Sequence, residues 1–312
     1  MQRTQQSQSK PGRSAQMTAA RVAKQDEFYT KLEDIRAECD RHADSFRGKN
    51  ILCPCDGSGS NFIKYFEDNF DRFELASLVG VQCNLGGLGM MYVKNPGTPP
   101  EISPLAYSAV FQSPAVLKLL RACDVVVTNP PFSLFRSFVE HIVRFRKKFL
   151  LLGNMATIGS KEIEYLVMSQ QLWFGYFGCS AMEFTLPDHY QRWMREEMRP
   201  DGSVQKYATV SSLIWATNLP VHKKLGHELT ATYDPSVYKK YDSPHWDAIE
   251  VPALKKIPKD YFDTMGVPIT FVVNWDPEQF EIIGFTSGNR IKGELSVDNE
   301  NCFRRVLIKR KT

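Results

Sequence analysis

The stretch D-V-V-V-T-N-P-P-F, residues 124–132, decides the fold of this chain. The four residues from Val125 to Thr128 are β-branched without a break, as in a strand that is buried on both faces of a parallel sheet. The two prolines after Asn129 cannot donate to a strand ladder, so the strand ends there. We therefore predict that Asn129 lies at the carboxyl end of a central strand, where open α/β sheets bind their ligands.

The residues after this strand form a set suited to binding an amino group. The side-chain carbonyl of Asn129 and the backbone carbonyl of Pro130 are two acceptors in a fixed geometry, and Phe132 is predicted to expose a flat ring beside them. Accepting both hydrogens of an –NH2 group pulls its nitrogen toward tetrahedral geometry and frees its lone pair to attack an electrophile. The alternative is that Asn-Pro-Pro is only a turn that ends the strand.

The tetrapeptide N-P-P-F resembles motif IV of the S-adenosylmethionine-dependent amino-methyltransferases. The sequence around it reads V-V-T-N-P-P-F-S-L-F-R, residues 126–136, and four further blocks occur in order along the chain. The series resembles the adenine-specific DNA methyltransferases of the EcoRI type, from about Asp26 to Gly284. The four blocks are D-E-F-Y-T (26–30), C-D-G-S-G-S-N-F (55–62), M-G-V-P-I-T-F (265–271) and N-W-D-P-E-Q-F-E-I-I-G (274–284).

This resemblance implies an α/β fold with a doubly wound, mostly parallel sheet of the Rossmann-like methyltransferase type and C-terminal additions for target recognition. It implies direct, in-line transfer of a methyl group from S-adenosylmethionine to the exocyclic N6 of adenine in double-stranded DNA. That amine is paired and stacked inside a duplex, so the adenine must be flipped into the pocket. The expected catalytic residues are Asn129 and Pro130 as acceptors, Phe132 as the stacking ring, and Pro131.

A strand, a glycine-containing turn and a helix precede the motif. Residues 51–53 read as the strand and 54–60 as the turn, and the helix that follows presents free N–H groups that can bind a carboxylate or a phosphate. Its place before N-P-P-F favours the methionine carboxylate of S-adenosylmethionine. Asp56 is expected to accept a hydrogen bond from the cofactor ammonium; the alternative is an ordinary turn aspartate. The expected cofactor-binding residues are Phe28, Tyr29, Thr30, Cys55, Asp56, Gly57, Gly59, Asn61 and Asn129.

Three positions depart from the family pattern. Residues 53–56 read C-P-C-D where D-P-F-x is common, and Val110 stands where an acidic residue often precedes the phenylalanine. The second strand, expected over 73–81, ends in V-G-V-Q and carries no acidic residue for the cofactor ribose. We therefore assign no ribose ligand.

Composition bounds the class of protein. The 312 residues carry a net charge of +4, which permits nucleic-acid binding without arguing for it. No apolar run approaches the roughly 20 residues of a membrane span, and the Gln- and Ser-rich amino terminus lacks a secretory h-region. Seven scattered cysteines favour a reducing compartment. We expect a cytoplasmic protein of a prokaryotic or phage context. No metal site is expected, because Cys53 and Cys55 have no partner pair and the histidines are too widely spread.

The chain is predicted to have three parts. Residues 1–25 read as a disordered basic tail, 26–185 as the S-adenosylmethionine-binding catalytic domain, and 186–312 as a target-recognition and wrapping region that partly completes the catalytic sheet. Basic and aromatic residues mix in the stretch 188–224, as phosphate contact and base stacking require. The alternative is a solvated loop. The residues expected to bind nucleic acid are Arg192, Trp193, Arg195, Lys223 and Lys224.

Hydrophobic periodicity and capping signals predict further elements. Helices are expected over 26–46, from Pro114 with Ser113 as its N-cap, and over 133–146 and 162–171. Strands are expected over 149–152, 210–216, 265–271 and 280–285, and a hairpin turn at 94–97.

Two other functions fit the same residues. An N-P-P-F site can methylate an adenine in RNA or a glutamine amide in a protein, because both present a planar amino group. Alternatively, the chain is a nucleic-acid-binding relative that has lost catalysis, which the departures at Val110 and at the ribose position would explain. The recognised DNA sequence, a cognate endonuclease and the oligomeric state are not predicted.

Overall fold

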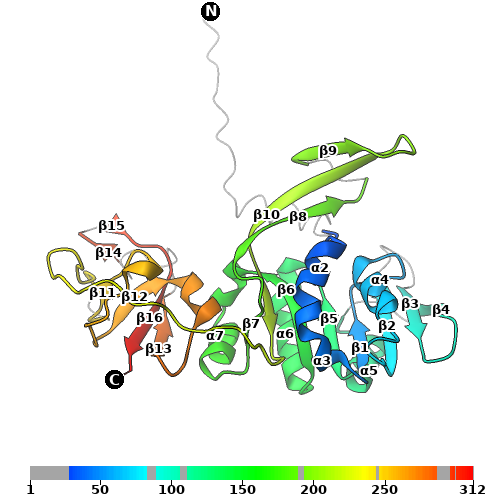
Figure 1. Ribbon diagram of the computed structural model, residues 1–312, viewed down its shortest axis with the longest axis horizontal. Coiled ribbons are helices and arrows are strands. Elements are labelled where there is room, and N and C mark those ends of the chain that lie inside the picture. Colours follow the sequence, from blue (N-terminus) through cyan, green and yellow to red (C-terminus); the bar gives the residue numbers. More distant parts are fainter. Residues whose placement is uncertain are drawn as a thin grey trace, which may run out of the picture.

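The computed structural model (Figure 1) describes residues 28–82, 89–105, 111–188, 193–243, 246–286, 296–298 and 300–311. The expected basic tail, Val110 and Arg192 lie outside these residues. Within them, no helix is both long enough and apolar enough to cross a membrane. The described part of the chain also contains no group of three or more His, Cys, Asp or Glu residues that could hold a metal ion.

A ten-stranded mixed sheet forms the centre of the molecule. Its order is β4-β3-β2-β1-β5-β6-β10-β7, with β8 and β9 both paired to β10. The four inner strands are parallel: β1 (Asn50–Cys53), β2 (Ser77–Gln82), β5 (Val125–Thr128) and β6 (Lys148–Asn154). Antiparallel strands extend both edges: β3 (Gly89–Lys94), β4 (Glu101–Leu105), β7 (Trp173–Phe174), β8 (Ser180–Leu186), β9 (Arg195–Met198) and β10 (Val204–Thr217).

The stretch that was predicted to be a central buried strand is β5. All four of its residues are buried, and it pairs in parallel with β1 on one side and β6 on the other. From β1 the chain passes to β2 on one side and later to β5 on the opposite side, so the strand order reverses between β1 and β5. Ligands of open α/β sheets bind at such a reversal, outside the carboxyl ends of the strands. The turn after β1 and the N-P-P-F motif after β5 both lie there.

Helices cover both faces of this sheet. Val125 and Val127 of β5 belong to one hydrophobic core and Val126 to another, as the alternation of side chains in a strand requires. The first core is covered by α2 (Leu32–Cys39), the 3-10 helix η1 (Asp40–His42), α3 (Ala43–Phe46) and α4 (Asn61–Asp68). The second is covered by α5 (Pro114–Ala122), α6 (Phe135–Arg144) and α7 (Lys161–Met168). This is the doubly wound α/β fold that was predicted.

A smaller four-stranded sheet follows in the C-terminal part of the chain. Its order is β11-β12-β16-β13, with β11 (Ile249–Glu250), β12 (Met265–Pro268), β13 (Phe280–Phe285) and β16 (Arg305–Arg310). Val267 and Ile308 of this sheet share one hydrophobic core with Ile163 of α7, so the smaller sheet is packed against the α7 side of the large one. The short elements here are η4 (Leu254–Lys256), η5 (Ile269–Asn274), β14 (Ser296–Val297) and β15 (Glu300–Asn301).

Several predicted boundaries were wrong, among them the start of the strand expected over 210–216, which begins at Val204, and the end of the helix expected over 162–171, which ends at Met168. The helix expected from residue 26 begins at Leu32, because Tyr29 instead exchanges two backbone hydrogen bonds with Thr185 of β8. The second strand begins at Ser77, after turns that include Glu74 at a positive φ of 50°. The strand expected over 265–271 ends at Pro268, which has no N–H to continue the ladder. The capped helix after Ser113 is confirmed, since its hydroxyl accepts from the N–H of Val116.

Glu38 ties the first helix to the far edge of the sheet. Its carboxylate is fully buried and accepts hydrogen bonds from the backbone N–H groups of Tyr176 and Phe177, and it also lies 3.0 Å from Nε2 of His42. The space is tight, because a Cβ atom at Gly175 would lie 1.9 Å from the Glu38 carboxylate. The contact fixes α2 against the segment after β7.

Replacing Glu38 with alanine is expected to lower the free energy of unfolding by about 3 kcal/mol or more, because two backbone N–H groups and the fully buried His42 lose their partner. Urea unfolding followed by circular dichroism measures the change. Glu33→Ala is the matched control, since Glu33 is exposed on the same helix and its loss should cost less than about 0.5 kcal/mol. Equal effects of the two substitutions would contradict the assigned role of Glu38.

Candidate active site

The Asn129 carboxamide is held in one orientation at the carboxyl end of β5. Its Nδ2 donates to the backbone carbonyl of Phe28 at 2.9 Å and to Oγ1 of Thr30 at 3.2 Å. The side-chain oxygen of Asn129 is buried, and no group in the described part of the chain donates to it. Because the Phe28 carbonyl can only accept, it requires the NH2 side of the amide, and Oδ1 is left as an unpaired acceptor.

Phe132 does not have the exposed ring that was predicted. It is only 9% exposed and begins the 3-10 helix η2 (Phe132–Leu134). The ring of Phe28 stacks on it, with centroids 5.9 Å apart, and Phe28 also contacts Phe184 of β8. The prediction was wrong because the segment 28–30, distant in sequence, crosses the end of β5 and covers one face of the ring.

The turn after β1 has the strand–turn–helix form that was predicted. Ser60 is the N-cap of α4, and its hydroxyl accepts from the N–H of Ile63. A Cβ atom at Gly57 would lie 2.8 Å from the Cβ of Gln82, so only glycine fits between the turn and the end of β2. A Cβ atom at Gly59 would meet nothing within 4 Å. The turn is therefore packed on one side and open at Gly59.

The segment 28–30 joins this turn to the N-P-P-F motif. The carbonyl of Thr30 accepts from Nδ2 of Asn61 at 2.8 Å, while the Thr30 hydroxyl accepts from Asn129. Hydrogen bonds and ring contacts thus bring together the predicted residues Phe28, Thr30, Asn61 and Asn129. Tyr29 is half exposed and pairs with Thr185, and Cys55 is partly buried in the turn.

Asp56 connects the turn to β5. Its Oδ2 accepts a hydrogen bond of 2.5 Å from the hydroxyl of Thr128, which is fully buried directly before Asn129. Burial raises the pKa of the Asp56 carboxyl from 3.8 to about 7, although hydrogen bonds from Thr128 and Ser60 oppose the shift. The ammonium contact expected for Asp56 stays a prediction. In this structure the Asp56 side chain links the turn after β1 to β5.

Three residues of this site were not singled out from the sequence. Thr128 binds Asp56, Gln82 lies against Gly57, and a Cβ atom at Gly80 would lie 2.5 Å from the carbonyl oxygen of Asp56. The available signal was positional: Gly80 and Gln82 close the second strand, and Thr128 is the only hydroxyl in β5. Partners this far apart in sequence could not be paired from spacing alone.

The residues expected to bind nucleic acid fall into two groups. Trp193 is exposed and Arg195 lies on β9, where its guanidinium pairs with Glu183 and Glu197. Lys223 donates to the backbone carbonyls of Gly175 and Val273, and burial lowers its pKa. Lys224 is exposed. Arg195 and Lys223 thus have partners within the protein, and their contact with nucleic acid stays a prediction.

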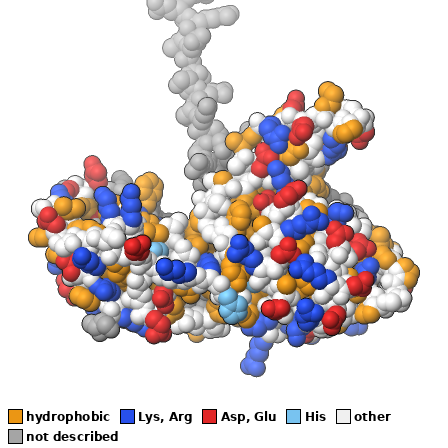
Figure 2. All heavy atoms as spheres, in the orientation of Figure 1, with side chains coloured by type: hydrophobic (Ala, Val, Ile, Leu, Met, Phe, Trp, Pro, Cys, Tyr) orange, Lys and Arg blue, Asp and Glu red, His pale blue; other side chains and the backbone are white. Residues whose placement is uncertain are grey.

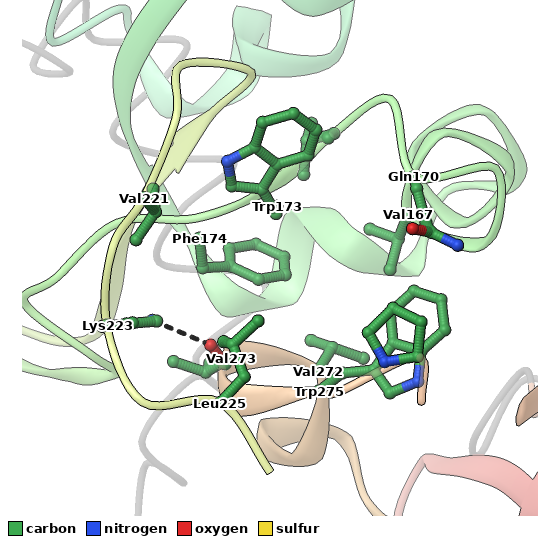
Figure 3. Close-up of a pocket in the computed structure, with 12 residues that line it drawn as sticks. Val167, Gln170, Trp173, Phe174, Val221, Lys223, Leu225, Val272, Val273 and Trp275 are labelled. Atoms are coloured by element: carbon green, nitrogen blue, oxygen red, sulfur yellow. Dashed lines mark hydrogen bonds between the residues drawn. The ribbon is translucent and has the colours of Figure 1, made fainter. Parts of the chain in front are cut away.

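A cavity of about 250 Å³ lies away from the N-P-P-F motif (Figure 3). It is enclosed by α7, β7, the segment 221–225 and η5, and its lining is mainly apolar. The Lys223 ammonium enters it and is bonded to the Val273 carbonyl. No catalytic residue predicted from the sequence lines this cavity.

The fold and the site together define a class. A doubly wound sheet, with a glycine-containing turn after β1 and N-P-P-F after β5 at the point of strand reversal, is the arrangement of a Rossmann-like methyltransferase. Residues 16–99 and 98–311 match the model of a family described as adenine-specific methyltransferase EcoRI. The chain belongs to this family, and it is an adenine-specific DNA methyltransferase.

Curated relatives support this assignment. The chain is 36% identical to the Type II methyltransferase M.EcoRI of Escherichia coli, over 94% of this chain and 95% of the relative. It is 37% identical to the Type II methyltransferase M.MpnI of Mycoplasma pneumoniae, over 85% of this chain and 83% of the relative. The Type II methyltransferase M.MgeORF184P of Mycoplasma genitalium is 33% identical over similar shares. No solved structure matches the chain significantly.

The raised pKa of Asp56 predicts a pH dependence of stability. Between about pH 4 and pH 7 the folded protein retains a proton that the unfolded chain releases, so the free energy of unfolding falls as the pH rises through this window. Each unit of difference in pKa corresponds to about 1.4 kcal/mol. Asp56→Asn should show a flatter dependence in urea unfolding at a series of pH values. Identical pH profiles of the two proteins would argue against a protonated Asp56.

Proposed function

We propose that this protein transfers the methyl group of S-adenosylmethionine to the exocyclic N6 of an adenine that is flipped out of duplex DNA. The unpaired, buried Oδ1 of Asn129 carries this proposal. A buried acceptor without a partner destabilises a protein by about 1–3 kcal/mol, unless a ligand supplies the missing donor. An amino group at the carboxyl edge of β5 supplies that donor.

Two acceptors act on the amine in this proposal. The Asn129 oxygen accepts one hydrogen, and the backbone carbonyl of Pro130 accepts the other. The amide cannot rotate to present its NH2 group, because Phe28 and Thr30 hold that end. With both hydrogens bound, the nitrogen lone pair points away from the acceptors toward the methyl donor. Catalysis then comes from positioning and from preorganised acceptors.

The residues around the turn after β1 fit the cofactor. Space is open at Gly59, the first N–H groups of α4 face the turn, and Asn129 lies across the strand reversal. When bound, S-adenosylmethionine supplies the electrophilic methyl group. We propose that Phe28, Tyr29, Thr30, Cys55, Asp56, Gly57, Gly59 and Asn61 hold it, and that Gln82 at the end of β2 adds an amide beside Gly57.

Flipping gives the target adenine access to this site. The curated relatives are named Type II methyltransferases, and the family is adenine-specific, which favours DNA adenine over the RNA and glutamine alternatives. The small exposed part of Phe132, with Pro131 beside it, would contact the base. We further propose that residues 26–185 bind the cofactor and that residues 186–312 recognise the target and partly complete the catalytic sheet.

Asn129→Ala is expected to lower the rate of methyl transfer by about 10²- to 10³-fold, the usual effect of removing one preorganised hydrogen-bond partner of the reacting group. Unmethylated plasmid DNA, RNA and bulk protein are each incubated with labelled S-adenosylmethionine, and the product is identified by mass spectrometry. Asn95→Ala, in the exposed β3–β4 turn, is the matched control and should retain activity. Label found in RNA or protein instead of DNA would show that the substrate is one of those two alternatives. An absence of cofactor binding would favour an inactive relative.

Thr30→Val is expected to lower the rate by about tenfold, because Asn129 loses one of the two acceptors that orient its amide. Thr30→Ser keeps the hydroxyl and should restore most of the activity. Steady-state kinetics should place the loss mainly in kcat, since the ground-state complex retains its other contacts. Equal activity of the valine and serine variants would count against this orienting role.

A further inference from the structure

The strands β8, β9 and β10 form an antiparallel arm that stands over the active-site edge of the sheet (Figure 1). Leu213 of β10 pairs with Asn154, the last residue of β6, so residues 204–210 of β10 continue beyond the carboxyl edge. Asn129 follows β5 at that same edge. The outer part of the arm is the β9–β10 ribbon, joined by a turn at Gly202, and it is two-stranded beyond Leu186, the last residue of β8.

On one face of the arm, the charged side chains pair with one another. Glu183 accepts from both Lys31 and Arg195, and Arg195 also pairs with Glu197. The Arg195 guanidinium lies 3.9 Å from the centroid of the Tyr207 ring. These groups satisfy one another, so this face has little charge left for a ligand.

The opposite face is largely apolar and begins at the active site, with Lys206 and Glu196 as the charged residues that strand pairing places on it. Strand alternation places Met182, Phe184 and Leu186 of β8 on it, and Phe184 contacts Phe28, which stacks on Phe132. Farther out, Val204 pairs with Met198 on the same face. The arm exposes apolar side chains both at the start of β9 and near the turn at Gly202, and Figure 2 shows apolar side chains over its outer end. They are Trp193 (43% exposed), Met194 (74%), Met198 (76%) and Val204 (38%).

Duplex DNA is the partner that fits this ribbon. The described ribbon residues 195–206 carry three basic side chains (Arg195, Arg199, Lys206) and three acidic ones (Glu196, Glu197, Asp201), so attraction to phosphates does not explain the surface. Four exposed apolar side chains are far fewer than the roughly 20–30 residues that each partner contributes to a stable protein interface. A two-stranded ribbon fits the major groove, and methionine is among the side chains that contact or separate base pairs.

We propose that the β9–β10 ribbon enters a groove of the DNA next to the flipped adenine and places Met198 and Val204 against base edges. This inference rests on the proposed function, because it needs a duplex whose target adenine occupies the site near Asn129. The ribbon then contributes to recognition through apolar contact, while the paired charges on its other face keep it rigid.

The test starts with the recognition sequence. Wild-type protein methylates a plasmid library, and the modified adenines are mapped by sequencing. A short duplex of the mapped sequence, with 2-aminopurine at the target adenine, reports affinity and base flipping by fluorescence. The variants are Met198→Ala, the double variant Met198→Ala/Val204→Ala, and Met168→Ala as control. Met168 is an exposed methionine outside the arm, 39% exposed on α7.

The double variant is expected to bind the mapped duplex about tenfold more weakly or worse, with a smaller 2-aminopurine signal and relaxed sequence preference. The dependence of its affinity on salt should stay unchanged, because no phosphate contact is removed. Met168→Ala should behave as wild type, and thermal unfolding should show that all variants fold.

If the wild-type protein methylates DNA and the double variant keeps the same affinity, base flipping and sequence preference, this inference is wrong and the proposed function stands. A change confined to self-association in sedimentation would also overturn it, in favour of a second copy of the chain as partner. A wild-type protein that neither binds nor methylates DNA would overturn the proposed function together with this inference.

Discussion

The Asn129 carboxamide depends on an acceptor that lies 101 positions earlier in the chain, the backbone carbonyl of Phe28. That carbonyl is in place because Tyr29 pairs with Thr185 of β8, β8 pairs with β10, and β10 pairs with β6 beside β5. The antiparallel strands at this edge of the sheet thus close a ring of hydrogen bonds around the motif. Without that ring the amide could rotate, and its oxygen would not remain a directed acceptor.

Two buried carboxylates support the same arrangement from different sides. Glu38 accepts backbone N–H groups and holds the first helix, which follows the segment 28–30, against the end of the sheet. Asp56 binds Thr128 and so connects the turn after β1 with the last residue of β5. Both side chains stay buried because hydrogen-bond partners satisfy them, as burial of a polar group requires. They give the site rigidity that its loops would lack alone.

The arm shows how one β-structure can have two different surfaces. On one face, Glu183, Arg195, Glu197 and Lys31 form a closed ionic network. On the other, apolar side chains extend outward from Phe184 beside the active site to Met198 and Val204, with Glu196 and Lys206 between them. Isolated surface ion pairs contribute little stability, but a network with an arginine over an aromatic ring fixes the geometry of a ribbon that projects from the sheet.

The sequence by itself determined the strand at 125–128, its end at the prolines, the strand–turn–helix unit before it, and the family. These features rest on local rules: β-branched residues, missing N–H donors, helix caps and ordered motifs. Only the tertiary structure decided that Phe132 is covered by Phe28, that Asp56 binds Thr128, and that Arg195 and Lys223 have partners inside the protein. Those contacts join residues far apart in the chain, and no local rule of spacing specifies which distant segment will pack against a given residue.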